Sequence, residues 1–218
     1  MEAIYERWGP ELFDKIWSST GFNDQQTSLI ADGLKSASKI LDLGTGIGNV
    51  AQELLKRGKT VYGVDISQRM LDYTTRKISS PHFVPVIRDA NDLHYVSEFD
   101  GAYCASNMAY FDDIGTVVEN VYRALRPSGL FAVTGYERDR MHKWADLTGQ
   151  ESRKAIEEGR VSLNEGELKK LAEAVNEELT TIDSSDRTRN TLRANGFTVL
   201  RDEKFYHDTS YFILAQKV

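Results

Sequence analysis

A short apolar run followed by closely spaced glycines constrains this chain more than any other feature. Residues 39–58 begin with Lys-Ile-Leu-Asp-Leu, continue through glycines at 44, 46 and 48, and pass directly into a helical pattern. This order predicts a β-strand, a tight turn and the start of an α-helix. A ligand can approach the backbone of such a turn closely, because glycine has no Cβ. The free N–H groups and the dipole of the helix start favour a negatively charged group there.

The spacing of the glycines distinguishes between two classes of cofactor. Dinucleotide-binding folds use G-x-G-x-x-G, whereas this chain has G-x-G-x-G preceded by Asp42. A carboxylate at the strand tip repels a pyrophosphate but attracts an ammonium group. A ligand with an amino acid end and a nucleoside end therefore suits the turn better than NAD does.

The segment resembles the first motif, [DE]-x-G-x-G-x-G, of the Rossmann-like (class I) S-adenosylmethionine-dependent methyltransferases. Asp42, Gly44, Gly46 and Gly48 match it in full. The resemblance implies S-adenosyl-L-methionine as the cofactor and S-adenosyl-L-homocysteine as its product. Within the same turn, Thr45 is expected to contact the cofactor.

Further along the chain, apolar runs alternate with helical patterns. Expected strands at 61–64, 83–87, 99–104 and 130–133 indicate a doubly wound, mostly parallel α/β sheet. Pro85 places the strand at 83–87 on an edge of that sheet. Runs at 197–206 and 211–215 are too close for a crossover and predict an antiparallel hairpin. The resemblance implies seven strands in the order 3-2-1-4-5-7-6, with the last strand antiparallel.

The whole chain is expected to be one methyltransferase domain. Residues 38–137 form its cofactor-binding core, and residues 187–218 its C-terminal helix and hairpin. Residues 1–37 read as an N-terminal helical cover, and residues 138–186 as a polar helical insertion. The insertion follows the fifth strand, at the carboxyl edge where ligands of open α/β sheets bind. Both outer segments are interpreted as lid-like, although a solvated helical pair that only supports the domain remains an alternative.

Composition narrows the partners and the location. The formal net charge is −6, and the basic residues form no long run, which disfavours a nucleic acid partner. Cys104 is the only cysteine, so neither a disulfide nor a cysteine-based metal site is expected, and we expect no metal. The chain shows no signal-like or membrane-spanning apolar run, so a cytoplasmic location is expected. The protein is expected to be a monomer or a homodimer.

Acidic residues at strand ends are the next cofactor candidates. Asp65 ends the second strand and is expected to accept from both ribose hydroxyls, with Ile66 lying against adenine. The alternative for Asp65 is a simple helix cap. Asp89 and Ala90 follow the third strand. The resemblance implies that the Asp89 side chain and the Ala90 backbone form hydrogen bonds with the edge of the adenine base. Met70, on the helix after the second strand, is also assigned to the cofactor site.

The end of the fourth strand and the N-terminus supply further candidates. Residues 107–110 faintly resemble the Asn-Pro-Pro-Tyr motif of amino-group methyltransferases but lack both prolines. Ser106 or Asn107 is expected to contact the methionine part, and Asn107 and Tyr110 are candidates for positioning the acceptor. Tyr5 and Trp8 resemble the aromatic N-terminal segment that covers the cofactor in many small-molecule methyltransferases; otherwise they pack a helix onto the core.

Candidate catalytic groups lie near the fifth strand and the terminal hairpin. Glu137 ends the fifth strand and could hold a cationic or amine substrate. His207 in the hairpin turn and His142 at the start of the insertion are candidate general bases, because histidine exchanges protons near neutral pH. A solvated turn histidine is the competing interpretation for His207.

Together these features predict a methyltransferase that modifies an O or N atom of a small metabolite. Two alternatives remain open. One is a methyltransferase of a protein side chain or terminus. The other is a protein that binds the cofactor without methyl transfer, as a regulatory partner or a cyclase-like enzyme.

Overall fold

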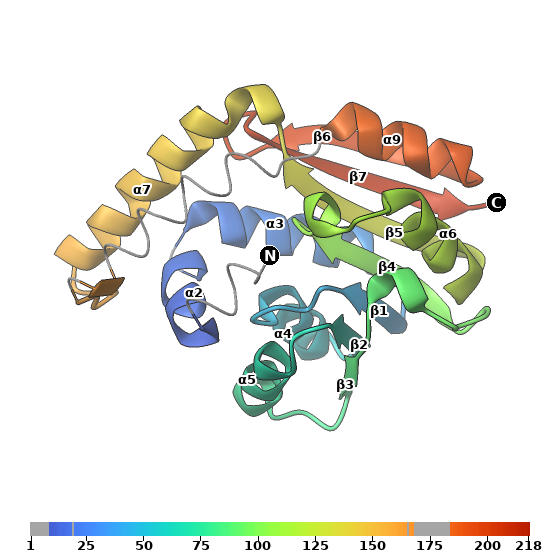
Figure 1. Cartoon of the computed structure of the whole chain (residues 1–218), viewed down its shortest axis with the longest axis horizontal. Helices are drawn as coiled ribbons and strands as arrows, with labels where there is room; N and C mark the ends of the chain where they lie inside the picture. The colour runs from blue at the N-terminus through green and yellow to red at the C-terminus, as the bar shows by residue number, and fades with distance from the viewer. Residues whose placement is uncertain (1–8, 19, 165, 168–183) are drawn as a thin grey trace.

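Seven strands form a single mixed sheet in this computed structural model, in the order β3-β2-β1-β4-β5-β7-β6 (Figure 1). The structure describes residues 9–18, 20–164, 166–167 and 184–218. The strands are β1 (Lys39–Leu43), β2 (Thr60–Asp65), β3 (Phe83–Ile87), β4 (Phe99–Ala105), β5 (Leu125–Tyr136), β6 (Phe197–Phe205) and β7 (Ser210–Lys217).

The pairing directions match the predicted topology. Strands β1 to β5 are paired in parallel, whereas β7 is antiparallel to both β5 and β6. The proline in β3 is tolerated because β3 pairs only with β2 and so forms an edge. The β6–β7 turn therefore lies at the same edge as the carboxyl ends of β1 to β5. The fifth strand is longer than predicted, since Leu125 already pairs with Phe99.

Helices cover both faces of the sheet. They are α2 (Pro10–Trp17), α3 (Gly21–Gly33), α4 (Asn49–Lys56), α5 (Gln68–Ile78), α6 (Ile114–Ala124), α7 (Met141–Glu157) and α9 (Ser185–Ala194). Helices α3, α4 and α5 lie on one face, and α6 and α9 on the other (Figure 1). The α7 helix extends away from the sheet beyond α3.

Alternating side chains of the strands supply two separate cores, one on each face. Ile40 packs with the residues of α3 and α4, whereas its neighbour Leu41 packs with those of α6 and α9. This alternation is the period of a β-strand, and both residues are fully buried because the sheet is covered on both sides. Within the described part of the chain, no helix combines the length and the hydropathy needed to cross a membrane.

Candidate functional site

The glycine turn joins β1 to α4 and is held in left-handed backbone conformations. Gly44, Gly46 and Gly48 have φ of 72°, 49° and 73°. A Cβ on Gly44 would lie 2.6 Å from Nδ2 of Asn107, and one on Gly48 would collide with Thr74. At Gly46 an added Cβ would have only the Gly44 carbonyl oxygen within reach, at 4.0 Å. The protein itself therefore packs against the two outer glycines, and the middle one leaves room for a ligand.

Asp42 lies in β1, two residues before the first glycine of this turn, and its side chain is buried. Its side chain is only 1% exposed, and its Oδ2 accepts a hydrogen bond of 2.5 Å from the Thr45 hydroxyl. Burial raises the pKa of Asp42 to about 7, and the nearby Asp65 raises it further, while Thr45 and Tyr103 oppose the shift. The second oxygen, Oδ1, is buried near the Tyr103 hydroxyl, and neither atom has a hydrogen bond of good geometry among the described residues. A buried acceptor of this kind is costly unless a donor reaches it.

Asp65 braces the glycine turn from the end of β2. One carboxylate oxygen accepts from the Gly46 N–H at 2.9 Å, and the other accepts from the Ser67 N–H at 2.9 Å. These two bonds fix the orientation of the carboxylate. The helix cap is supplied by Ser67, whose hydroxyl accepts from the Met70 N–H. Asp65 is thus a part of the turn itself, which the sequence pattern did not predict.

The candidates for the adenine end lie along the same edge. Ile66, directly after β2, is 70% exposed, an unusual value for an isoleucine. Asp89 follows β3 and caps a 3₁₀ turn by accepting from the Asn91 N–H at 2.8 Å, while Ala90 is buried. The apolar side chain and the exposed carboxylate follow adjacent strands, as the sequence predicted.

The end of β4 contacts the glycine turn through Asn107. Its Nδ2 donates to the Gly44 carbonyl at 2.7 Å and lies 3.4 Å from that of Leu43. Asn107 thus supports the turn.

Ser106 has a positive φ of 60°, and its hydroxyl accepts from Nε2 of Gln26 at 2.5 Å. Gln26 is a buried residue of α3 that sequence reasoning missed, because nothing in a helical pattern marks one glutamine as a long-range contact. Tyr110 ends the next 3₁₀ turn and is half-buried.

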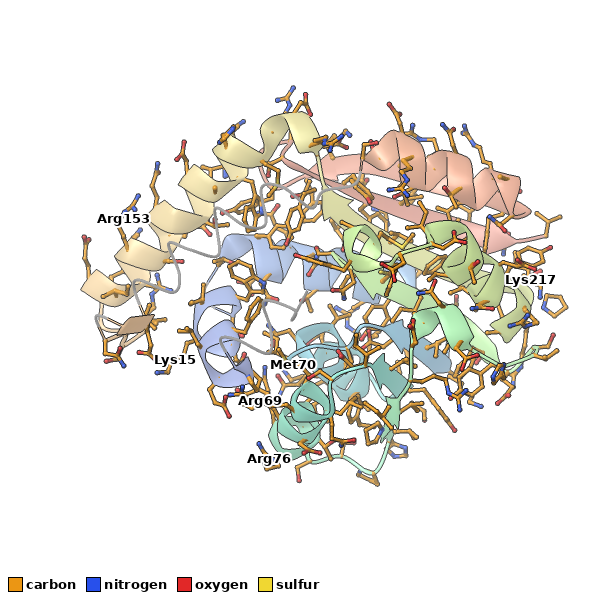
Figure 2. The ribbon with its side chains drawn as sticks, in the orientation of Figure 1. Lys15, Arg69, Met70, Arg76, Arg153 and Lys217 are labelled. Atoms are coloured by element: carbon orange, nitrogen blue, oxygen red, sulfur yellow. The ribbon has the colours of Figure 1, made fainter. Side chains whose placement is uncertain are left out.

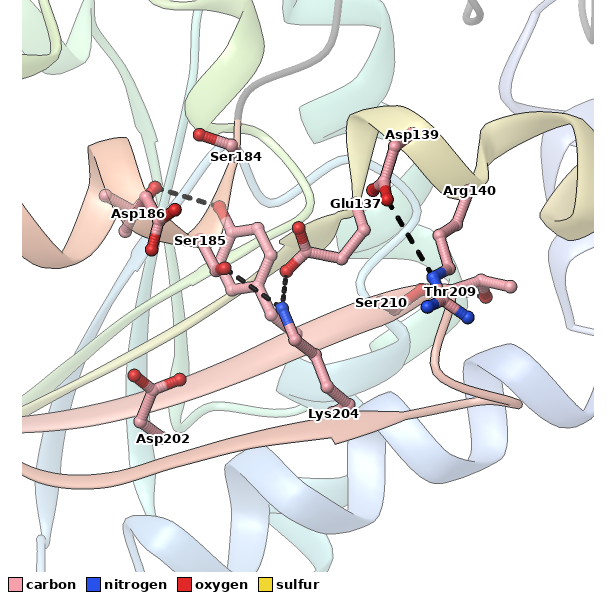
Figure 3. A network of polar contacts seen from close by, with 12 residues as sticks. Glu137, Asp139, Arg140, Ser184, Ser185, Asp186, Asp202, Lys204, Thr209 and Ser210 are labelled. Atoms are coloured by element: carbon pink, nitrogen blue, oxygen red, sulfur yellow. Dashed lines mark hydrogen bonds and ion pairs between the residues drawn. The ribbon is translucent and has the colours of Figure 1, made fainter.

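Glu137 has a partner of opposite charge. Its carboxylate, 9% exposed as a residue, pairs with the ammonium of Lys204 from β6, which also donates to the Ser185 hydroxyl at 3.0 Å (Figure 3). The Glu137 backbone N–H donates to the Thr209 carbonyl, which ties the end of β5 to the β6–β7 turn. In this arrangement the ammonium of Lys204 balances the charge of the Glu137 carboxylate. A cationic substrate would therefore have to compete with Lys204 for Glu137.

The two candidate bases lie on different elements at this end of the sheet. His207 is exposed in the β6–β7 turn with a φ of 59°, and its carbonyl accepts from Lys143 of α7 at 2.8 Å. His142, next to Lys143, is also exposed. The Lys143 contact therefore brings the two histidine-bearing segments together.

Three further candidates are Met70, which contacts the N-terminal helix α2, and Tyr5 and Trp8. Met70 is 2% exposed and packs with Leu12, Phe13 and Ile16 of α2 and with Ile47 of the glycine turn. Figure 2 shows Met70 on the side of α5 that faces α2. Met70 thus reaches the turn through Ile47. Tyr5 and Trp8 lie outside the described residues.

Sequence comparison finds similarity over the core of this site. Residues 40–129 match the model of a family described as a methyltransferase domain. YqeM of Bacillus subtilis (strain 168) is 30% identical over 135 residues, which are 58% of this chain and 53% of that protein. The S-adenosyl-L-methionine-dependent Diels-Alderase iccD of Talaromyces variabilis is 31% identical over 138 residues, which are 60% of this chain and 46% of that protein. The chain thus spans about half the length of these curated relatives.

Structural comparison extends the similarity to the whole sheet. The N-methyltransferase NodS from Bradyrhizobium japonicum WM9, solved with S-adenosyl-L-homocysteine, superposes with a TM-score of 0.70. The match covers 98% of each chain at 14% sequence identity. At this identity the likeness concerns the fold.

Proposed function

We propose that this chain is a class I S-adenosylmethionine-dependent methyltransferase and that it transfers a methyl group from S-adenosyl-L-methionine to an O or N atom of a small metabolite; the match to a methyltransferase domain and the fold support this. The observation that carries the proposal is the glycine turn, braced by Asp65 and placed above the unsatisfied carboxylate oxygen of Asp42. Of the three glycines, only Gly46 has no side-chain atom within 4 Å of the position that a Cβ would take.

The residues of the turn suit this cofactor chemically. An ammonium group would donate to the buried Oδ1 of Asp42, and the Asp65 carboxylate at the end of β2 would accept from ribose hydroxyls. The exposed Ile66 offers an apolar surface to a purine, and Asp89 offers an acceptor to its exocyclic amino group. Asp42, Gly46 and Asp65 would therefore hold the amino acid and ribose ends, and Ile66 and Asp89 the base.

When bound, S-adenosyl-L-methionine supplies a methyl group on a positively charged sulfur. The chain must then align the acceptor with that methyl group and keep water away, which can remove several kcal/mol of entropic barrier. Asn107, anchored on the Gly44 carbonyl, and Tyr110 would orient the acceptor from the end of β4. Where the acceptor carries a proton, His207 or His142 is the candidate to remove it.

The acceptor class rests on charge and on the covering segments. The net charge of −6 disfavours a polyanion, and α2 and α7 contact the ligand edge of the sheet, through Ile47 and through the β6–β7 turn. A protein side chain or terminus is the alternative acceptor. Cofactor binding without methyl transfer is a second candidate function, favoured by the similarity to a relative named as a Diels-Alderase.

A transfer assay with labelled cofactor separates these functions. The protein is incubated with methyl-tritiated S-adenosyl-L-methionine and a cell extract divided by size into metabolites and macromolecules. Label in the metabolite fraction supports the proposal, whereas label in protein establishes the alternative acceptor. Binding of the cofactor with no label in either fraction would contradict methyl transfer.

The variant Asp65→Ala tests the cofactor site by its affinity for S-adenosylhomocysteine, and Asp72→Ala, at an exposed position of α5, is its control. Removing the charged acceptor at Asp65 should weaken S-adenosylhomocysteine binding by about 1.5–3 kcal/mol. Asp72→Ala should bind as the wild type does. Equal affinity of all three proteins would show that Asp65 is not the ribose acceptor.

A further inference from the structure

The glycine turn is contacted by an N-terminal helix that is remote from it in sequence. Leu12, Phe13 and Ile16 of α2 pack against Ile47, which lies between Gly46 and Gly48 in the turn. All four side chains are less than a tenth exposed. The face of α2 that covers the turn is therefore apolar and closely packed.

A single lysine connects this helix to the turn by polar contacts. Nζ of Lys77, near the end of α5, donates to Oδ1 of Asp14 in α2 at 2.8 Å. It also donates to Oδ1 of Asn49 at 2.6 Å and to the backbone carbonyl of Ile47 at 3.2 Å. An ammonium group has three N–H donors, so these contacts use its whole capacity. Asn49 is the first residue of α4, so Lys77 joins three elements that surround the turn.

The acidic partner of this lysine is held equally well. Asp14 also accepts from the Tyr73 hydroxyl at 2.6 Å and from the Ser18 hydroxyl at 2.5 Å. Burial alone would raise the pKa of Asp14, but the hydrogen bonds from Lys77, Ser18 and Tyr73 hold it below its usual value. Both side chains are largely buried, at 18% exposure for Lys77 and 17% for Asp14. A partly buried pair with further hydrogen bonds is screened less than a surface ion pair.

We propose that Lys77 is a positioning residue for cofactor binding, because it links the docking of α2 to the conformation of the glycine turn. The Ile47 carbonyl immediately precedes Gly48, whose left-handed backbone starts α4. When α2 leaves this site, Lys77 loses Asp14 and the turn loses the apolar cover of Ile47 at the same time. Docking of α2 and binding of the cofactor therefore favour each other, as two events that stabilise one conformation. The inference rests on the proposed cofactor site, but it does not require methyl transfer.

The direct test compares Lys77→Met with Lys56→Met, which makes the same change at an exposed lysine of α4 whose ion-pair partner lies 3.9 Å away. Binding of S-adenosylhomocysteine is measured by calorimetry. Lys77→Met should raise the dissociation constant about tenfold or more, because the loss leaves Asp14 and the Ile47 carbonyl without a charged donor. Lys56→Met should bind as the wild type does. Lys77→Arg, which keeps the charge, should recover part of the affinity.

Hydrogen exchange supplies a second readout that a purely structural role would not produce. In the wild type, S-adenosylhomocysteine should slow exchange in residues 10–17 together with residues 44–49. In Asp14→Asn, which retains Lys77, exchange in residues 10–17 should be faster, and the ligand should slow it less.

The outcomes are distinct. Wild-type affinity in Lys77→Met would overturn the proposal, as would slowing confined to residues 44–49 in the wild type. The wild-type measurement decides the question even where a variant fails to fold. Absence of S-adenosylhomocysteine binding in the wild type would instead refute the proposed function.

Discussion

Replacing Asp42 with asparagine should stabilise the protein, and increasingly so as the pH rises. The carboxyl group has a pKa of about 7 in the folded protein against 3.8 as the reference value, because it is buried. Between these two values the folded state keeps a proton that the unfolded state has released. Wild-type stability therefore falls as the pH rises through this window, and the penalty is complete above pH 7. At about 1.36 kcal/mol for each unit, the full penalty is about 4 kcal/mol.

Urea denaturation of the wild type and of Asp42→Asn measures this penalty as a difference. The linkage relation gives a difference in unfolding free energy that grows by about 2–3 kcal/mol between pH 5 and pH 8. Other titrating groups cancel in the comparison, because both proteins share them. A pH-independent difference, or one that shrinks towards pH 8, would refute the argument that burial holds the proton on Asp42.

Cofactor affinity should also depend on the ionisation of Asp42, but it should rise with pH whereas the stability falls. An ammonium group binds the ionised carboxylate, and with a pKa of about 7 roughly a tenth of Asp42 is ionised at pH 6. Because apparent affinity scales with the competent fraction, wild-type binding of S-adenosylhomocysteine should tighten about tenfold from pH 6 to pH 8. Asp42→Asn should bind weakly, with little change over this range. A flat wild-type profile would exclude Asp42 as the partner of the ammonium group.

Gly44→Ala should lower the free energy of unfolding by at least about 1 kcal/mol more than Gly58→Ala does. Both glycines have a positive φ, but only at Gly44 would the added Cβ meet a neighbour, Nδ2 of Asn107, at 2.6 Å. Thermal unfolding of Gly44→Ala alone and with Asn107→Ala should show part of that excess relieved in the double variant; equal costs for the two glycines would disprove the contact. His207→Gln and His142→Gln should each keep nearly full kcat, because both rings are exposed and outside the cofactor motifs. A fall of about 100-fold or more in either variant would identify the general base and reverse this expectation.

The sequence was sufficient for the fold because the strands repeat one local pattern. Each of the five parallel strands contains a short apolar run and has a polar or glycine residue at its end or directly after it, and the connections are too long for hairpins until the last one. Strand order and pairing direction are confirmed, and residues 40–129 match the model of a methyltransferase domain, as the resemblance implied. The glycine turn could be placed because Gly44, Gly46 and Gly48 have a backbone requirement that is visible in the sequence.

The electrostatic environment of the site could not be predicted in the same way. The pairing of Glu137 with Lys204 joins residues 67 positions apart, and that of Lys77 with Asp14 joins residues 63 apart. Such contacts depend on tertiary packing, and any surface lysine has the same local signature. The burial that raises the pKa of Asp42 likewise comes from neighbouring strands, and no local pattern encodes it.

The most direct test of the account is a pair of calorimetric titrations of the wild type at pH 8, one with S-adenosyl-L-homocysteine and one with NAD. The central claim is that the turn around Gly46, with Asp42 and Asp65, selects a nucleoside that carries an amino acid. Saturable binding of S-adenosylhomocysteine, with no heat from NAD, is the predicted result. NAD binding with equal or higher affinity would contradict the claim.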